Sequence, residues 1–363
     1  MWITAFTFTH HISAAQEYPL IASEVWQKKV RVAQNILLSV IVPVYNTPER
    51  YLNAMLASMF DGLPAATEII MVDDGSEHTT AEILDHISTA HDAVTVIHQT
   101  NGGQNAARNN GVRHAHGTYV AFCDADDILR WNRMAGIMSI LAQGDVDAVA
   151  FNCDLIDDRD VETPGYGFTK FPSEVYDNDP KRQVLSQCAE MWRNIIRRSL
   201  LTEELFGCDS NIGEDLAVVF LALARTRSIA VCDVSPYLYR VHTGGAERSA
   251  DAQKRVRILD VFDFIWLHLD ERLRTQYRQE IEWQAIWHVL YTEMAPLLAD
   301  VNANRKYIRQ LTHWMDDRFP QWRENRYLIY LEQHEGLRFK LIISRRYWLY
   351  SIVHRCATLC RNR

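Results

Sequence analysis

Short apolar runs alternate with amphipathic segments over the first third of the chain. The runs lie at residues 37–46, 68–72, 94–97 and 119–123. Continuous apolar runs of this length are typical of strands that are buried on both faces of a sheet. The segments between them have apolar residues at helical spacing and lie at residues 48–60, 79–87 and 105–114. Strands that alternate with helices favour a parallel sheet with right-handed crossovers, so we predict an α/β fold.

Three of the expected strands end in polar residues. Tyr45-Asn46 follows the first strand, Asp73-Asp74 the second, and Asp124-Ala125-Asp126-Asp127 the fourth. Parallel α/β sheets bind their ligands outside the carboxyl ends of the strands. We therefore expect the three polar clusters to converge on one binding site.

The acidic run at 124–127 is the strongest indication of a chemical function in the sequence. Its three carboxylates repel one another and are costly to remove from water. A divalent cation removes both problems, and Mg²⁺ commonly binds through one or two carboxylates together with substrate phosphates. The run thus predicts a site for Mg²⁺ or Mn²⁺ and a phosphate ester, although a solvated acidic loop would have the same composition.

The composition is that of a globular protein. The 363 residues are 48% hydrophobic and 23% charged, and the net charge of −8 argues against binding to nucleic acid. The seven cysteines lack CxxC spacing, which favours a reducing compartment. Met1 to Phe6 lack the features of a secretory signal, and no apolar stretch is long enough to span a bilayer. We expect a cytoplasmic protein.

A dinucleotide-dependent dehydrogenase is the obvious rival for an α/β chain. Such enzymes need a glycine-rich turn after the first strand, where the pyrophosphate approaches the helix N-terminus. This chain has Tyr45-Asn46-Thr47-Pro48 at that position and contains no P-loop. The sequence therefore argues against that class.

Four motifs together resemble the family 2 glycosyltransferases, in order and in spacing. They are Ser39–Asn46, Val72–Ser76, Asn101-Gly102-Gly103 with Ala107-Arg108-Asn109, and Asp124–Asp127. A weaker set extends the resemblance to about residue 245 and comprises Trp192, Gly213-Glu214-Asp215 and Tyr237–Arg240. This arrangement is similar to that of bacterial transferases that build capsule, exopolysaccharide or O-antigen.

The resemblance implies a GT-A fold and a nucleotide-diphosphate sugar as donor, with a UDP-sugar expected. The acceptor would be a saccharide or a lipid-linked saccharide. The positions that the resemblance assigns to donor binding are Pro43, Tyr45, Asn46, Asp73, Asp74, Gly102, Arg108, Asp124 and Ala125. Asp126 would hold the metal on the diphosphate, and Asp215 matches the catalytic base, with Glu214 beside it. Relatives often carry a lysine where this chain has Asn194, so Arg193 or Arg197 would have to replace its diphosphate contact.

The implied reaction is a single displacement with inversion at the anomeric carbon, because one base is present without a separate nucleophile. Two other functions remain open: a sugar-1-phosphate nucleotidyltransferase and a catalytically silent nucleotide-sugar-binding protein. Several motif residues also have structural interpretations. Asp73 and Asp74 could cap the next helix, Asn101 to Gly103 could be only a turn, Arg108 could be an exposed helix residue, and Glu214-Asp215 could be first-turn acids. Trp192, Tyr237 and Tyr239 suit the core, and His242 suits a loop or a metal ligand.

We divide the chain into an extension at 1–34, a transferase domain at 35–250, a helical region at 251–335 and a basic amphipathic helix at 336–363. After Glu335 there are seven basic residues and no acidic one. The last segment also has an apolar stripe formed by Phe339, Ile342, Ile343, Leu349, Tyr350 and Val353. Such a helix suits an anionic membrane surface, here the cytoplasmic face of the inner membrane, or else packs on the protein.

Overall fold

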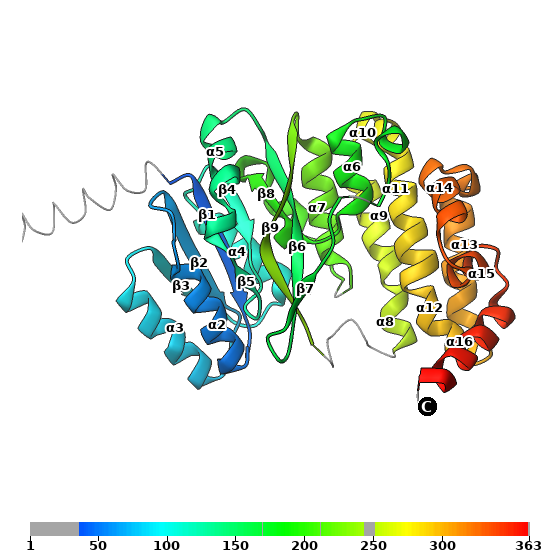
Figure 1. Ribbon diagram of the computed structural model, residues 1–363, viewed down its shortest axis with the longest axis horizontal. Coiled ribbons are helices and arrows are strands. Elements are labelled where there is room, and N and C mark those ends of the chain that lie inside the picture. Colours follow the sequence, from blue (N-terminus) through cyan, green and yellow to red (C-terminus); the bar gives the residue numbers. More distant parts are fainter. Residues whose placement is uncertain (1–35, 169, 211, 243–250, 362–363) are drawn as a thin grey trace, which may run out of the picture.

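The computed structural model describes residues 36–168, 170–210, 212–242 and 251–361, so the extension at 1–34 lies outside the described residues. One sheet has the strand order β3-β2-β1-β4-β8-β6-β9-β5, and β7 pairs with β6 (Figure 1). The strands are β1 Leu38–Val44, β2 Thr67–Asp73, β3 Val94–His98, β4 Tyr119–Phe122, β5 Ile128–Leu129, β6 Ala148–Asp157, β7 Glu162–Pro164, β8 Asn194–Arg197 and β9 Ile229–Val241.

Helices cover the sheet and continue beyond it. Those before residue 243 are α2 Glu49–Phe60, α3 His78–Ala90, α4 Gln104–His114, α5 Ala135–Gln143, α6 Pro180–Gln187 and α7 Glu214–Arg225. The later ones are α8 Ala252–Val256, α9 Ile258–His268, α10 Glu271–Gln276, α11 Arg278–Ala285, α12 Met294–Leu297, α13 Arg305–Arg318, α14 Arg326–His334, α15 Leu337–Ile343 and α16 Tyr347–Arg361. A π-helix, Ile286–Thr292, continues α11. Figure 1 shows these later helices stacked beside the sheet.

The predicted α/β class is confirmed, but the sheet is mixed rather than wholly parallel. Strands β1, β2, β3 and β4 are parallel to one another, as their alternation with helices predicts. Strand β8 then pairs antiparallel with both β4 and β6. The reversal is invisible in the sequence pattern because β8 contains only four residues.

The central strands β1, β2 and β4 are buried because helices cover both faces of the sheet there. Every residue of β1 is buried. Val40 and Val42 belong to the core shared with α2, whereas Ile41 belongs to the opposite core, shared with α4. Helix α4 lies so close that a Cβ at Gly111 would be 2.4 Å from Cγ2 of Ile41. This close packing fixes α4, and with it Arg108, against the end of the sheet.

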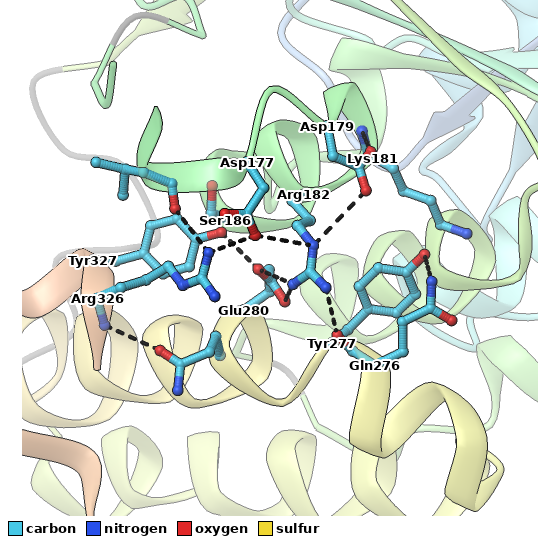
Figure 2. A network of polar contacts seen from close by, with 12 residues as sticks. Asp177, Asp179, Lys181, Arg182, Ser186, Gln276, Tyr277, Glu280, Arg326 and Tyr327 are labelled. Carbon is cyan, nitrogen blue, oxygen red and sulfur yellow. Dashed lines mark hydrogen bonds and ion pairs between the residues drawn. The ribbon is translucent and has the colours of Figure 1, made fainter. Parts of the chain in front are cut away.

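A buried ion pair ties the helical region to the transferase part (Figure 2). Nη1 of Arg182 on α6 lies 2.9 and 3.1 Å from the two carboxylate oxygens of Glu280 on α11. The hydroxyl of Tyr327 donates to the same carboxylate at 2.6 Å. Glu280 is fully buried, and this burial raises its pKa. A buried carboxylate with three such bonds holds α6, α11 and α14 together.

The C-terminal segment forms two helices instead of the single helix expected for 336–363. The break follows Ile343, and Arg345 there has φ +56° and pairs with Asp316 at 2.6 Å. Most of the apolar stripe is buried against the helical region, including Phe339, Ile342, Ile343 and Tyr350. The stripe is therefore not the surface that would meet a membrane. Within the described residues, no helix has the length and apolar character needed to cross a bilayer.

Candidate functional site

The three carboxylates after β4 lie in different environments. Asp127 is 1% exposed and accepts hydrogen bonds from the Tyr237 hydroxyl at 2.7 Å and the Arg240 backbone N–H at 2.6 Å. Burial raises the pKa of Asp127 well above its usual value, and repulsion from Asp124 and Asp126 adds to this. Asp127 therefore anchors the acidic loop to β9. The sequence leaves Asp127 either to support its acidic neighbours or to cap the next helix, and these contacts fit the first role.

Asp124 and Asp215 are joined by one buried arginine. Nη2 of Arg108 lies 3.0 Å from Oδ1 of Asp124, and Nη1 donates to Oδ1 of Asp215. Arg108 is 1% exposed, which rules out the interpretation of an exposed helix residue. Burial lowers the pKa of its guanidinium, but the charges of Asp215 and Asp124 outweigh this and raise it. Gln104, one turn earlier on α4, also donates to Oδ1 of Asp124 at 3.0 Å.

Glu214 and Asp215 begin α7, as the first-turn interpretation predicts, and Asp215 also faces the site. Gly213 precedes them with φ +70°, and a Cβ there would lie 2.8 Å from Cδ1 of Ile258. Burial raises the pKa of Asp215, while Arg108 and the Met191 backbone N–H act against this shift. Burial and the Asp215 charge raise the pKa of Glu214. A carboxylate with a raised pKa is a better proton acceptor, which is the property that a general base requires.

Asp126 lies against a histidine from the end of β9. Nε2 of His242 is 2.9 Å from Oδ2 of Asp126, and Nδ1 is 2.8 Å from Oδ1 of Asp158. Burial lowers the pKa of His242, but its bonds to Asp126 and Asp158 raise it above the usual value. The sequence alone did not connect these three residues.

The residues around Asp126 fit a metal ion that is shared with a substrate. In the described part of the chain, no three His, Cys, Asp or Glu side chains form a ready-made metal cage. Asp126 has a carboxylate that is 36% exposed, and the adjacent His242 adds an imidazole nitrogen. Mg²⁺ usually binds through one or two carboxylates plus substrate phosphates and water, and Mn²⁺ also accepts imidazole. Asp126 and His242 would therefore hold such an ion together with a diphosphate.

Asp73 and Asp74 are buried and organise loops. Both oxygens of Asp74 accept backbone N–H bonds, from Gly102 and Gly103, each at 2.8 Å. Asp73 accepts from the Ser76 backbone N–H at 2.9 Å and contacts Nδ1 of His98 at 2.7 Å. Neither caps α3, which begins at His78 after Glu77. The cap interpretation is wrong, because the chain makes an additional turn between these aspartates and the helix.

The other predicted donor residues surround the same strand ends. Tyr45 is 56% exposed at the end of β1, whereas Pro43 lies within the strand. Asn46 has φ +47°, and its side-chain oxygen accepts from the Glu77 backbone N–H at 2.7 Å. Gly102 belongs to the loop held by Asp74, as described above. Ala125 is 5% exposed and packs into the core, so only its backbone is available to a ligand.

The aromatic residues of the weaker motif set are core residues. Trp192 stacks on Tyr237 and Tyr239, with ring centroids 4.6 and 5.2 Å apart. Trp192 and Tyr237 are buried, so the packing interpretation holds for both. Neither arginine considered as a replacement for the absent lysine faces Asp126. Arg197 pairs with Asp147 at 2.9 Å, near the start of β4, and Arg193 is 2% exposed over Phe168.

Comparison with known proteins identifies the domain that carries this site. Residues 39–203 match the sequence model of glycosyl transferase family 2. The chain contains a family 2 glycosyltransferase domain. Asp215 and His242 lie beyond the matched range, and α7 and the end of β9 bring them to the carboxylates of the family 2 domain.

The sequence relatives match part of the chain. An uncharacterized glycosyltransferase of Bacillus subtilis (strain 168), EpsJ, is 28% identical over 214 residues, which cover 56% of this chain and 61% of EpsJ. YibD of Escherichia coli (strain K12), another uncharacterized glycosyltransferase, is 36% identical over 117 residues, which cover 32% of this chain and 34% of YibD. The chain thus matches less than two thirds of the length of either protein.

The structural neighbours cover more of the chain. S. aureus TarS 1-349 matches with a TM-score of 0.53 at 18% identity, covering 89% of this chain and 91% of that one. The same TarS fragment in complex with UDP-GlcNAc matches with a TM-score of 0.56 at 19% identity, covering 89% and 92%. Identity at this level establishes the fold alone. The predicted GT-A fold with a C-terminal helical region is confirmed.

Sequence reasoning missed three residues that contact the family 2 site. They are Gln104, Asp158 and, as the partner of Asp127, Tyr237. Gln104 had a usable signal, because it lies four residues before Arg108 and therefore on the same helix face. Asp158 had none, since it follows β6, a strand that the apolar pattern did not indicate.

Proposed function

We propose that the chain is a glycosyltransferase that moves a sugar from a nucleotide-diphosphate sugar to a saccharide or lipid-linked saccharide. The observation that carries the proposal is the contact of Arg108 with both Asp124 and Asp215. One side chain thereby connects the proposed donor carboxylate to the proposed base. The family 2 domain and its relatives support the reaction class, and the UDP-GlcNAc complex of TarS supports a UDP-sugar as donor.

In the proposed reaction, Asp215 accepts the proton of the acceptor hydroxyl as its oxygen attacks the anomeric carbon. General bases of this kind contribute on the order of 10² to 10⁴ in rate. With a single base and no covalent nucleophile, the displacement inverts the anomeric carbon. A Mg²⁺ or Mn²⁺ ion held by Asp126 and His242 would stabilise the negative charge of the leaving nucleoside diphosphate.

In this proposal, the remaining donor-site residues shape the pocket or orient the donor. Asp74 uses both carboxylate oxygens on the backbone of Gly102 and Gly103, so we propose that it serves the donor by shaping that loop. Tyr45 presents an exposed ring at the end of β1, where the base of a nucleotide would stack. Arg108 holds Asp124 and Asp215 at a fixed separation.

The test begins with a thermal-shift screen of nucleotide sugars with and without Mn²⁺, because a bound donor raises the melting temperature by mass action. The donor found there is then used in a transfer assay with the wild-type protein and Asp215→Asn. We expect Asp215→Asn to keep the donor-induced shift and lose transfer. Near-normal turnover in this variant would contradict the role of Asp215.

The same assay separates the other two functions. Synthesis of a nucleotide sugar from a nucleoside triphosphate and a sugar 1-phosphate would indicate a nucleotidyltransferase. The end of β1 has no glycine- and arginine-rich loop for that reaction. Donor binding without hydrolysis or transfer, in the presence of Mn²⁺, would indicate a binding protein.

We further propose that the chain acts in surface-polysaccharide assembly at the cytoplasmic face of the membrane. The exposed side of α16 carries Trp348 at 65% and Ile352 at 51% exposure, four residues apart, with Arg346 and Arg355 also exposed. An aromatic and an aliphatic side chain flanked by arginines suit an anionic bilayer surface. Deleting 336–363 would remove buried core residues such as Phe339, so point variants are the better test.

The measurement is sedimentation with vesicles of phosphatidylglycerol and phosphatidylcholine. Trp348→Ser with Ile352→Ser should reduce the bound fraction, whereas Leu267→Ser, at a residue 76% exposed on α9, should not. Equal sedimentation of the double variant and the wild type would argue against this surface.

A further inference from the structure

A cavity of about 560 Å³ lies at the other end of the sheet from the carboxylates of the site. It opens between the start of α6, the turn from α7 into β9, and α10. Strand β9 begins beside the cavity at Ile229 and ends at Val241, immediately before His242. An extended strand rises about 3.3 Å per residue, so the two ends of β9 lie on the order of 40 Å apart and the cavity is separate from the proposed donor site.

The cavity is strongly basic. Four cations line it, namely Lys181, Arg225, Arg227 and Arg272, against one carboxylate, that of Asp179. That carboxylate already caps α6, where Oδ1 accepts the Lys181 backbone N–H at 2.9 Å. Its other oxygen lies 3.8 Å from Nε of Arg182, outside the cavity lining. The lining therefore carries an excess of positive charge.

Two of the four cations have no carboxylate partner in the described part of the chain. Arg225 pairs with Glu204 at 2.8 Å, and Arg227 contacts Asp147 at 3.4 Å with a side chain that is 87% exposed. No carboxylate of a described residue lies within ion-pair distance of Lys181 or Arg272. Arg272 is exposed, and among the described residues its side chain makes one polar contact, a 3.4 Å bond to Oε1 of Gln276.

Lys181 is held in place although it lacks an anion. Its Nζ donates to the Thr226 carbonyl oxygen at 2.5 Å and lies 4.9 Å from the centroid of the Tyr277 ring. Figure 2 shows Lys181 beside Tyr277 at the edge of the polar network around Arg182. Burial, together with the charge of Arg272, lowers the pKa of Lys181 to about 8, against the attraction of Asp179 and Asp147. A bound anion would offset the cost of burying the charged ammonium group of Lys181 and its repulsion from Arg272.

We propose that this cavity binds a phosphate group carried on a small sugar or polyol. The exposed guanidinium groups of Arg227 and Arg272 supply paired N–H donors, which match the oxygens of a phosphate. The ammonium group of Lys181 supplies a further positive charge from the wall. A volume of about 560 Å³ exceeds the needs of inorganic phosphate and lies within the range of small-molecule sites. The site does not depend on the proposed transferase activity.

The test is isothermal titration calorimetry of the full chain at low ionic strength. The probes are inorganic phosphate and glycerol 3-phosphate, with glycerol as the uncharged control and EDTA present to keep the donor site free of metal. We expect both phosphates to bind, glycerol 3-phosphate more tightly, and glycerol not at all. In Arg227→Gln with Arg272→Gln the association constant should fall about tenfold or more, because two charge-assisted contacts are lost.

Matched variants keep the proposal falsifiable. Arg278→Gln removes the same charge from an exposed position on the neighbouring α11, outside the cavity lining, and should leave binding within about twofold. An unchanged melting temperature of the double variant confirms that it is folded. The proposal is overturned if neither phosphate binds, if the double variant binds as well as the wild type, or if Asp126→Ala abolishes binding.

Discussion

Nε2 of His242 lies 2.9 Å from Oδ2 of Asp126, although 116 residues separate the two in the sequence. The same imidazole reaches Asp158 through its other nitrogen at 2.8 Å. We propose that Asp126 and His242 form a two-residue site for a substrate-bridged ion, in which Asp158 orients the imidazole ring through Nδ1.

His242→Ala should raise the Mn²⁺ concentration needed for half-maximal transfer by about tenfold or more, because one nitrogen donor is lost. The measurement is the initial rate against Mn²⁺ concentration. Asp158→Asn keeps the imidazole and should shift that concentration less. Identical Mn²⁺ curves for His242→Ala and the wild type would show that the imidazole does not bind the ion.

Arg108→Gln should move the acid limb of the pH-rate profile to higher pH. The Arg108 charge holds down the pKa of Asp215, so its removal raises that pKa and protonates the base at a higher pH. The measurement is kcat across pH at saturating donor. Arg113→Gln, at an exposed position on the same helix, serves as the charge control. An unshifted profile in Arg108→Gln would mean that Asp215 is not the titrating base.

Tyr237→Phe should lower the free energy of unfolding by about 1–3 kcal/mol, because the buried carboxyl of Asp127 loses a hydrogen-bond donor. The Asp124 backbone N–H loses its acceptor in the same change. Urea unfolding at neutral pH measures the effect. Tyr45→Phe removes an exposed hydroxyl and should change stability little. If both variants were equally stable, the Tyr237 bond would not anchor the acidic loop.

His98→Gln should destabilise the protein more at about pH 5.5 than at about pH 8.5. Hydrogen bonds to Asp73 and Asp85 raise the pKa of His98 above 6.5. The resulting stability is complete below pH 6.5 and is lost as the pH rises through the folded-state pKa. Burial raises the pKa of Asp73, but Ser76 and His98 lower it below 3.8, so the carboxylate stays ionised at the lower test pH.

Urea unfolding of His98→Gln at both pH values gives the comparison. His78→Gln removes an imidazole that is 86% exposed and should have a small effect at both. Equal destabilisation of His98→Gln at the two pH values would contradict a charged His98 in the folded state.

The elements up to the acidic run could be predicted because their signals are local. The helix expected at 79–87 is found at His78–Ala90, and the strand expected at 68–72 at Thr67–Asp73. The short strands β5 and β8 have two and four residues, too few for a period to appear. The positions of these two strands in the sheet depend on hydrogen bonding to segments far away in the sequence. The spacing of residues in a single sequence does not reveal such pairings.

The sequence was enough to predict which residues belong to the candidate site, but not which of them contact one another. Motif resemblance grouped Arg108, Asp124 and Asp215, but it did not indicate that one guanidinium contacts both carboxylates. It assigned Asp74 to the donor, whereas the structure shows both its oxygens bonded to backbone N–H groups. Burial decides such roles, and burial is a property of the folded chain rather than of the motif.

The pairing of Arg182 with Glu280 has a consequence for engineering. The family 2 match ends at residue 203, so the border of the match falls between the two partners. A chimera joined at that border would leave Glu280 charged and fully buried without its cation, at a cost of about 3–5 kcal/mol. The helical region thus cannot be exchanged by itself, and a graft of this region has to include α6.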